Sequence, residues 1–205
     1  MVVTTTKLEA INIMLSAVGE SPVSALDGSN ADAVVAENIL DEVNKDVQSR
    51  AWHFNTEYDV VLAPDAETNQ ITLPTNASRV DLEDVNAGTK DVVERGRKLY
   101  DKKAHSYTFT ESVKATVAYL FEFVDIPENA RRYIAIRAAR IFQDRMVGSP
   151  DHHTFNLRDE LTALSDLKEY EGDTGDHTIF DNYDVFRIVD RGSVISRVTG
   201  TASKP

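Results

Sequence analysis

The sequence predicts an α+β protein, an antiparallel four-helix bundle formed by N- and C-terminal helical hairpins around an inserted antiparallel β domain. Three observations support this. Apolar residues recur at helical spacing near both ends, they alternate in the middle, and glycines and prolines divide that middle into short runs. The expected parts are residues 1–51 as one hairpin, 52–124 as the β domain, 125–171 as the second hairpin, and 172–205 as an extended C-terminal arm.

The first helix has signals at both ends. Thr6 and Glu9 have the spacing of a capping box, in which each side chain accepts a hydrogen bond from the other residue's backbone. Gly19 can adopt the left-handed conformation that ends a helix, and Pro22 prevents its continuation. The apolar stripe between these ends consists of Leu8, Ile11, Leu15 and Val18.

A second helix is expected from about Asn30 to about Arg50. Ser29 and Asp32 repeat the capping pattern, and a short connection from the first helix favours antiparallel packing. Its apolar face is expected to contain Val35, Ile39, Val43 and Val47. Trp52 and Phe54 follow directly, and we interpret them as a hydrophobic hinge between bundle and β domain.

The middle segment changes to the period of two that is typical of strands. The clearest run has Val113, Ala115, Val117, Tyr119, Phe121 and Phe123 on one face. Weaker alternation predicts three further strands, around Tyr58–Leu62, Ile71–Leu73 and Val80–Val85. Such alternation indicates an antiparallel sheet with one face exposed to solvent.

Helical periodicity returns after Pro127, a residue tolerated in the first turn of a helix. The third helix is expected to bury Ile134, Ala138, Ile141 and Phe142 and to end at Gly148. The fourth begins at Ser149 and Pro150 and continues to about Tyr170. Its apolar face is predicted to consist of Leu157, Leu161, Leu164 and Leu167.

The composition excludes several classes of function. The chain has no cysteine, so disulfides and thiolate metal sites are excluded. A net charge of −12 disfavours a protein that grips DNA phosphates. The start has no signal-peptide pattern, and the most apolar run, residues 117–121, is far shorter than the roughly 20 residues of a membrane helix. We expect a soluble protein without a membrane association.

Arginines are concentrated on the third helix and are candidate interface residues. One interpretation pairs them with acidic residues of the fourth helix, and the other places them at a contact with another subunit, because a guanidinium binds carboxylates bidentately. Both interpretations stay open, and different arginines can serve different roles. The expected acidic partners are Asp159, Glu160, Asp166 and Glu169. The candidates for an interface are Arg131, Arg137, Arg140 and Arg145, and Arg132 belongs to the same cluster.

The C-terminal arm is apolar for a tail that is interrupted by glycines. Disorder is one interpretation of it. The favoured one is an arm that becomes ordered against a neighbouring subunit, where burial of apolar side chains offsets the lost conformational entropy. The residues expected to contact that subunit are Phe180, Tyr183, Phe186 and Ile188.

No catalytic, metal-binding or cofactor-binding residue is predicted. The sequence has neither a G-x-S-x-G nucleophile elbow nor a phosphate-binding loop, and the adjacent His152 and His153 lack the spacing of a zinc site. An alternative function is a glycan hydrolase, which needs two carboxylates facing one cleft. The carboxylates considered for it are Glu83, Asp84, Glu111, Glu122 and Asp125.

Several segments together resemble the tail tubular protein A family of short-tailed, autographivirus-type bacteriophages. The resemblance covers roughly residues 5–185 and is most specific in the two helical parts. It is carried by Gly19-Glu20-Ser21-Pro22-Val23, Ala31-Asp32, Gln48-Ser49-Arg50-Ala51-Trp52-His53-Phe54-Asn55, Arg132-Tyr133-Ile134, Arg137-Ala138, Arg140, Phe142, Arg145, Gly148, Asp159-Glu160 and Tyr170-Glu171.

This resemblance implies a structural adaptor of the virion tail, assembled in the host cytoplasm. It implies a dodecameric ring of identical subunits between the portal protein and the tail nozzle, tail tubular protein B, with tail fibres as a further neighbour. Double-stranded DNA would pass through the ring without specific binding, and no cofactor or catalytic residue comes with the family. A glycan hydrolase and a free-standing binding module for another tail protein are the rival functions.

Overall fold

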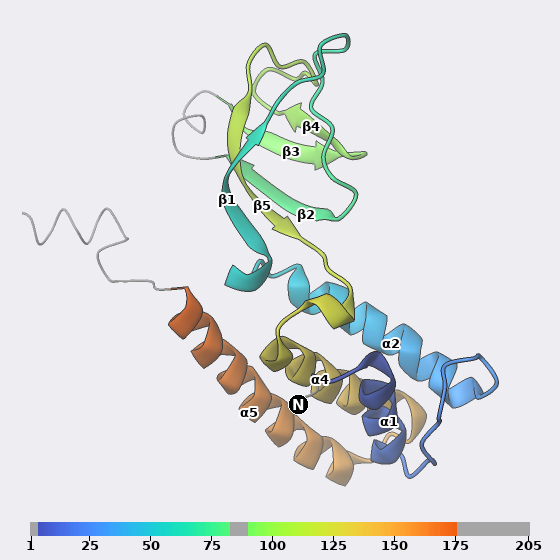
Figure 1. Cartoon of the computed structure of the whole chain (residues 1–205). Coiled ribbons are helices and arrows are strands. Elements are labelled where there is room, and N and C mark those ends of the chain that lie inside the picture. The colour runs from blue at the N-terminus through green and yellow to red at the C-terminus, as the bar shows by residue number, and fades with distance from the viewer. Residues whose placement is uncertain (1–3, 83–89, 176–205) are drawn as a thin grey trace, which may run out of the picture. The chain divides into compact units, whose positions relative to one another are not determined.

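The computed structural model describes residues 4–82 and 90–175, and these form a mixed α+β structure with small antiparallel sheets (Figure 1). In chain order, its helices and strands are α1 (Lys7–Ala17), α2 (Ala31–Gln48), η1 (His53–Asn55), β1 (Thr56–Leu62), β2 (Ala77–Leu82), β3 (Val92–Arg95), β4 (Lys98–Asp101), β5 (Val113–Tyr119), η2 (Phe123–Asp125), α4 (Glu128–Met146) and α5 (Pro150–Thr174). Contacts divide the chain into two units, residues 1–171 and 172–205.

The ends of the first two helices follow local sequence signals, with one correction. The capping box of Thr6 and Glu9 is present at the start of α1, and Gly19 has a φ of +82° just after its end. At the start of α2 the cap is Asn30, whose side chain accepts a hydrogen bond from the backbone N–H of Ala33. The prediction of Ser29 as the cap was wrong by one residue, since Ser29 lies in the preceding turn, where its N–H donates to the carboxylate of Asp27.

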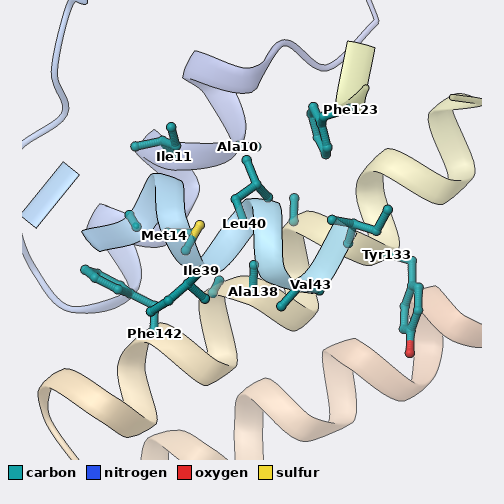
Figure 2. Close-up of a cluster of buried hydrophobic side chains, with 14 of the residues drawn as sticks. Ala10, Ile11, Met14, Ile39, Leu40, Val43, Phe123, Tyr133, Ala138 and Phe142 are labelled. Carbon is teal, nitrogen blue, oxygen red and sulfur yellow. The ribbon is translucent and has the colours of Figure 1, made fainter. Parts of the chain in front are cut away.

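One hydrophobic core joins helices from both ends of the chain. Ala10, Ile11 and Met14 of α1 pack with residues of α2 and α4, and all three are fully buried (Figure 2). The α4 residues Ala138 and Phe142 are also fully buried, as the sequence pattern predicts. Burial of a large apolar side chain contributes about 1.5–3 kcal/mol, so this core is a main source of stability. The further members of this core that Figure 2 labels are Ile39, Leu40, Val43, Phe123 and Tyr133.

The fourth helix, α5, uses a different face from the one predicted. Ala163 and Leu167 are the α5 residues buried in the core, with Leu164 partly buried beside them. Leu157 and Leu161 are 38% and 58% exposed, so their assignment to the apolar face was wrong. The helix is rotated so that two acidic residues on the buried side, Glu160 and Glu171, meet polar groups of other elements.

The β residues form a second core beneath two small sheets. In the three-stranded sheet the order is β1-β5-β2, with both pairs antiparallel, and β3 pairs with β4 in a separate hairpin. Inward residues of β5 such as Val113 and Val117 pack with Leu99 of β4. Strands are thus confirmed at residues 58–62, 80–82 and 113–119, whereas Val85 of the expected third strand lies outside the described residues.

Two parts of the β region differ from the alternation in sequence. Ile71 and Leu73 are buried but lie in no strand. The carbonyl oxygen of Ile71 accepts from the N–H of Leu99 in β4, and the N–H of Leu73 donates to the carbonyl oxygen of Arg97 in the turn before β4. The long run in β5 ends at Tyr119, so Phe123 leaves the sheet and packs in the helical core. The β3–β4 hairpin was not predicted, because its strands have only four residues each and carry many charges.

A cluster of buried amides joins the helices to the β region. The side chain of Gln48, at the end of α2, donates to the carbonyl oxygen of Phe121 at 2.9 Å and accepts from its N–H at 2.8 Å. Asn44 donates to the same carbonyl oxygen at 3.1 Å. Asn55 donates to the carbonyl oxygens of Gln48 and Tyr119. The chain therefore leaves and re-enters the helical core at one fixed point.

We expect Gln48→Ala to lower the free energy of unfolding by about 2–4 kcal/mol, because the buried backbone groups of Phe121 lose their partners. Urea denaturation followed by circular dichroism measures the change. Ser49→Ala is the matched control, since Ser49 is exposed and adjacent. Equal stability of the two variants would contradict a structural role for the amide cluster.

The corrected face of α5 gives a second prediction. Leu167→Ala should lower the free energy of unfolding by about 2–5 kcal/mol, because it leaves a cavity in the core. Leu161→Ala on the same helix should change it by less than about 0.5 kcal/mol, since Leu161 is exposed. Thermal or chemical unfolding of both variants decides between the two faces, and a reversed order would restore the predicted stripe.

Candidate assembly surfaces

Four of the five α4 arginines, Arg131, Arg137, Arg140 and Arg145, are held by partners within the chain. The predicted partner Glu160 is used, whereas the other acidic partners of these α4 arginines lie on α2 and on α4 itself. The three expected α5 partners Asp159, Asp166 and Glu169 have no ion pair with these arginines in the described part of the chain. The pairing interpretation was therefore right for one acidic residue out of the four named.

Glu160 is the centre of the most buried ion pairs. Its side chain is 9% exposed and receives a hydrogen bond from Nε of Arg140, and Nη1 of Arg137 lies 3.5 Å from its second oxygen. Arg140 also contacts Asp144 at 3.1 Å, and Arg137 contacts Asp46 of α2 at 2.8 Å. The hydrogen bond to Glu160 and the negative charges of Glu160 and Asp144 hold the pKa of the Arg140 guanidinium above its ordinary value. These contacts fix α5 and α2 against α4.

Arg131 binds backbone carbonyl groups where the chain returns to the helices. Its guanidinium donates to the carbonyl oxygens of Ile126, Val124 and Thr5, the first at 2.8 Å. Thr5 in turn contacts the carboxylate of Glu128, with its N–H donating at 2.8 Å. Arg131 therefore joins the segment before α1 to the start of α4, and its predicted contact with another subunit is not tested by these bonds.

Two further arginines of α4 are exposed to solvent. Arg145 forms a bidentate pair with Glu42 of α2 at 3.0 and 3.1 Å, with both side chains more than half exposed. Arg132 is one of the residues that line a groove between α1, α4 and α5. The apolar part of the lining includes Ala17, Ile136 and Ala139. Asn156, also in its lining, has a buried amide nitrogen without a partner in the described structure.

Glu171 attaches the far end of α5 to the turn between α2 and β1. Its carboxylate accepts the backbone N–H of His53 at 2.5 Å and also that of Phe54. Burial raises the pKa of the Glu171 carboxyl, and these backbone hydrogen bonds only partly oppose the rise. Trp52 and Phe54 pack partly buried against the helical core. No pattern in the sequence predicts this use of Glu171.

Catalytic and metal chemistry finds no support in the described residues. Glu111, Glu122 and Asp125 are exposed, and Glu83 and Asp84 lie outside residues 4–82 and 90–175. Within those ranges no group of acidic, histidine or cysteine side chains could hold a metal ion. His153 pairs with Asp144 at 2.9 Å.

None of the helices in the described part of the chain has the length and hydrophobicity that a membrane span needs. The arm residues Phe180, Tyr183, Phe186 and Ile188 also lie outside the described residues.

In the described part of the chain, the charged residues of the helices mainly join one element of the chain to another. The tail tubular protein family matches residues 8–177. Tail tubular protein A of Klebsiella phage KP34 is 27% identical over 165 residues, which cover 80% of this chain and 86% of that protein.

The class is thus a structural protein of a bacteriophage tail. The chain belongs to the tail tubular protein family, because the family matches most of its length. Family membership places it in the virion tail, in an assembly with other tail components. The family is structural and not catalytic, and nothing supports the glycan hydrolase alternative.

Replacing Glu160 with alanine should lower the free energy of unfolding by about 3–5 kcal/mol, because Arg137 and Arg140 keep their charges in a partly buried site. Glu42→Ala removes the exposed partner of Arg145 and should lower the free energy of unfolding far less than Glu160→Ala does. Added salt should reduce the second effect but not the first. Urea denaturation at two salt concentrations measures both. Similar losses for the two variants would show that burial does not set the strength of these pairs.

Glu171 gives a prediction for pH. Because burial raises its pKa on folding, the native state binds a proton more tightly than the unfolded chain does. Its contribution to stability is present below the ordinary pKa of glutamate and is lost as pH rises through the raised pKa. Glu171→Gln should therefore gain stability relative to the natural chain over that interval. Unfolding curves across pH 4–8, about the range in which glutamate shifts matter, test this. A difference that is constant with pH would contradict it.

Proposed function

We propose that this chain is a ring-forming adaptor that links the portal to the tail nozzle and forms part of the channel for DNA ejection. The observation that carries the proposal is membership of the tail tubular protein family over residues 8–177. The relative in Klebsiella phage KP34 is named tail tubular protein A, which supports a place in the tail. A dodecamer, with the portal, tail tubular protein B and tail fibres as its neighbours, is the arrangement proposed.

The proposed subunit is a four-helix bundle with an inserted β domain. Support comes from the shared core, in which α1 and α2 pack against α4, while α5 contributes Ala163 and Leu167. A rigid subunit suits this role, because a ring that connects two other rings has to keep its shape while DNA passes. The ion pairs of Glu160 and the amide cluster at Gln48 supply that rigidity.

Contacts between subunits are proposed for the α4 arginines and the C-terminal arm. Arg145 is the best placed of the arginines, because its pair with Glu42 is exposed and a carboxylate of another chain could share its guanidinium. Arg131, Arg137 and Arg140 contribute by holding the surface in shape. For the arm, Phe180, Tyr183, Phe186 and Ile188 supply the apolar area that ordering on a neighbour would require.

DNA is proposed to pass through the ring without specific binding, and assembly is proposed to occur in the host cytoplasm. The net charge of −12 supports weak contact with DNA, because like charges repel. The absence of cysteine is compatible with a reducing compartment. No cofactor forms part of the proposal.

Electron microscopy tests the proposed adaptor. The purified chain is imaged alone and after mixing with purified portal protein, and class averages are examined for rotational symmetry. We expect rings of identical subunits bound to the portal. Monomers in both samples, with no density added to the portal, would overturn the proposal. A variant with Phe180, Tyr183, Phe186 and Ile188 changed to serine should fold but bind the portal or its neighbours more weakly.

A further inference from the structure

The turn of the β3–β4 hairpin, strand β4 and the residues that follow it form a basic surface on an acidic protein. Within residues 95–105 the chain has five lysines and arginines and one acidic residue, Asp101. The net charge of −12 therefore leaves −16 on the other residues. All five basic side chains are exposed, whereas Asp101 is 5% exposed and accepts hydrogen bonds from the backbone N–H groups of Lys103 and Ala104. We define the basic hairpin as Arg95, Arg97, Lys98, Lys102 and Lys103.

The local structure of this hairpin includes two unfavourable features. Arg95 and Lys98 are cross-strand partners, and like charges directly opposite each other destabilise a sheet. Gly96 and Arg97 form the turn, and Arg97 has a φ of +62°, a conformation that glycine or asparagine adopts at less cost. Costs of this kind are expected where a surface is kept for binding rather than for stability.

Two of the five basic side chains, Arg97 and Lys98, have no ion pair inside the described structure. Lys102 pairs with Asp91 at 2.9 Å, and Arg95 lies 4.0 Å from the centre of the Tyr100 ring. The rings of Tyr100 and Tyr107 meet edge to face, with 4.8 Å between their centroids. Arginine and tyrosine together are typical of protein interfaces.

An acidic surface that matches the hairpin lies on α5. Phe155, Asp159, Asp166 and Glu169 are spaced by three, four or seven residues, so they share one face of the helix. All four are exposed, and Phe155 is 72% exposed. The three carboxylates have no ion pair in the described part of the chain. This acidic face differs from the buried face that contains Ala163 and Leu167.

We propose that the basic hairpin of one copy binds the acidic face of α5 on another copy. Charge complementarity carries the inference, together with aromatic side chains on both surfaces, Tyr100 and Phe155. Identical chains with a net charge of −12 repel one another, and a contact between opposite charges offsets that repulsion. Two different patches meet, so the contact is of the head-to-tail type that closes into rings.

This inference rests on the proposed ring and names a contact between its subunits. DNA is the other polyanion that could bind the hairpin. The second copy is favoured because the chain outside the hairpin is strongly acidic and repels DNA, whereas those same carboxylates attract the hairpin of a neighbour.

Weak self-association in solution tests the contact without requiring a closed ring. Light scattering and sedimentation of the full chain over a range of concentrations give the pairwise interaction at low and at high salt. We expect attraction at low salt that added salt weakens, although chains of net charge −12 would otherwise repel most strongly at low salt. Repulsion at low salt in the natural chain would overturn the inference.

Charge reversals then identify the two surfaces. Arg97→Glu with Lys98→Glu should weaken self-association about tenfold, and Asp166→Lys with Glu169→Lys should do the same. Combining all four changes should restore association, because the charges are exchanged. Lys45→Glu with Lys168→Glu alters the net charge as much as the hairpin variant does and should leave the salt-sensitive attraction in place.

The outcomes distinguish this contact from DNA binding by the hairpin and from the proposed ring function. Unchanged association of the hairpin variant, or no recovery in the combined variant, would overturn it. Loss of duplex DNA binding in the hairpin variant, with self-association unchanged, would assign the hairpin to DNA and also overturn it. If variants with reversed charges still form rings on the portal, the contact is rejected and the proposed function is retained. If the natural chain shows pairwise attraction but forms no rings on the portal, the contact is retained and the proposed function is rejected.

Discussion

The structure depends on a cluster of buried amides at the point where the chain leaves the helices and returns to them. Gln48 binds both backbone groups of Phe121, and Asn55 joins the ends of α2 and β5 through their carbonyl oxygens. Buried backbone groups without partners are costly, so side chains that satisfy them fix the relation between neighbouring segments. These hydrogen bonds hold the start and the end of the β region close together.

Charged residues in the helical part act mainly between elements of the same chain. Glu160 holds two arginines of α4, while Glu171 binds the turn after α2, so both acidic residues determine where α5 lies. A helix with few apolar core residues can be attached by polar groups when these groups are partly buried and mutually satisfied. Its remaining faces, including Phe155 and Leu161, stay exposed.

The distribution of charge connects the subunit with the proposed assembly. Most of the chain is acidic, which favours solubility and weak contact with DNA. The same charge opposes packing of identical copies, so an oligomer needs local complementarity. The basic hairpin and the acidic face of α5 supply surfaces of opposite sign, and the groove beside Arg132 lies next to Asp159 of that face.

The sequence by itself determined the helices α1, α2 and α4, the three longer strands and the shared core, because capping residues and apolar periodicity are local signals. It also supported the family, through segments in the helical parts. Only the tertiary structure decided which face of α5 is buried, since leucines at helical spacing fit an interface as well as a core. It also decided the roles of Gln48, Glu160 and Glu171, whose partners are distant in sequence, and the position of the short β3–β4 hairpin, whose charged strands carry little periodic signal.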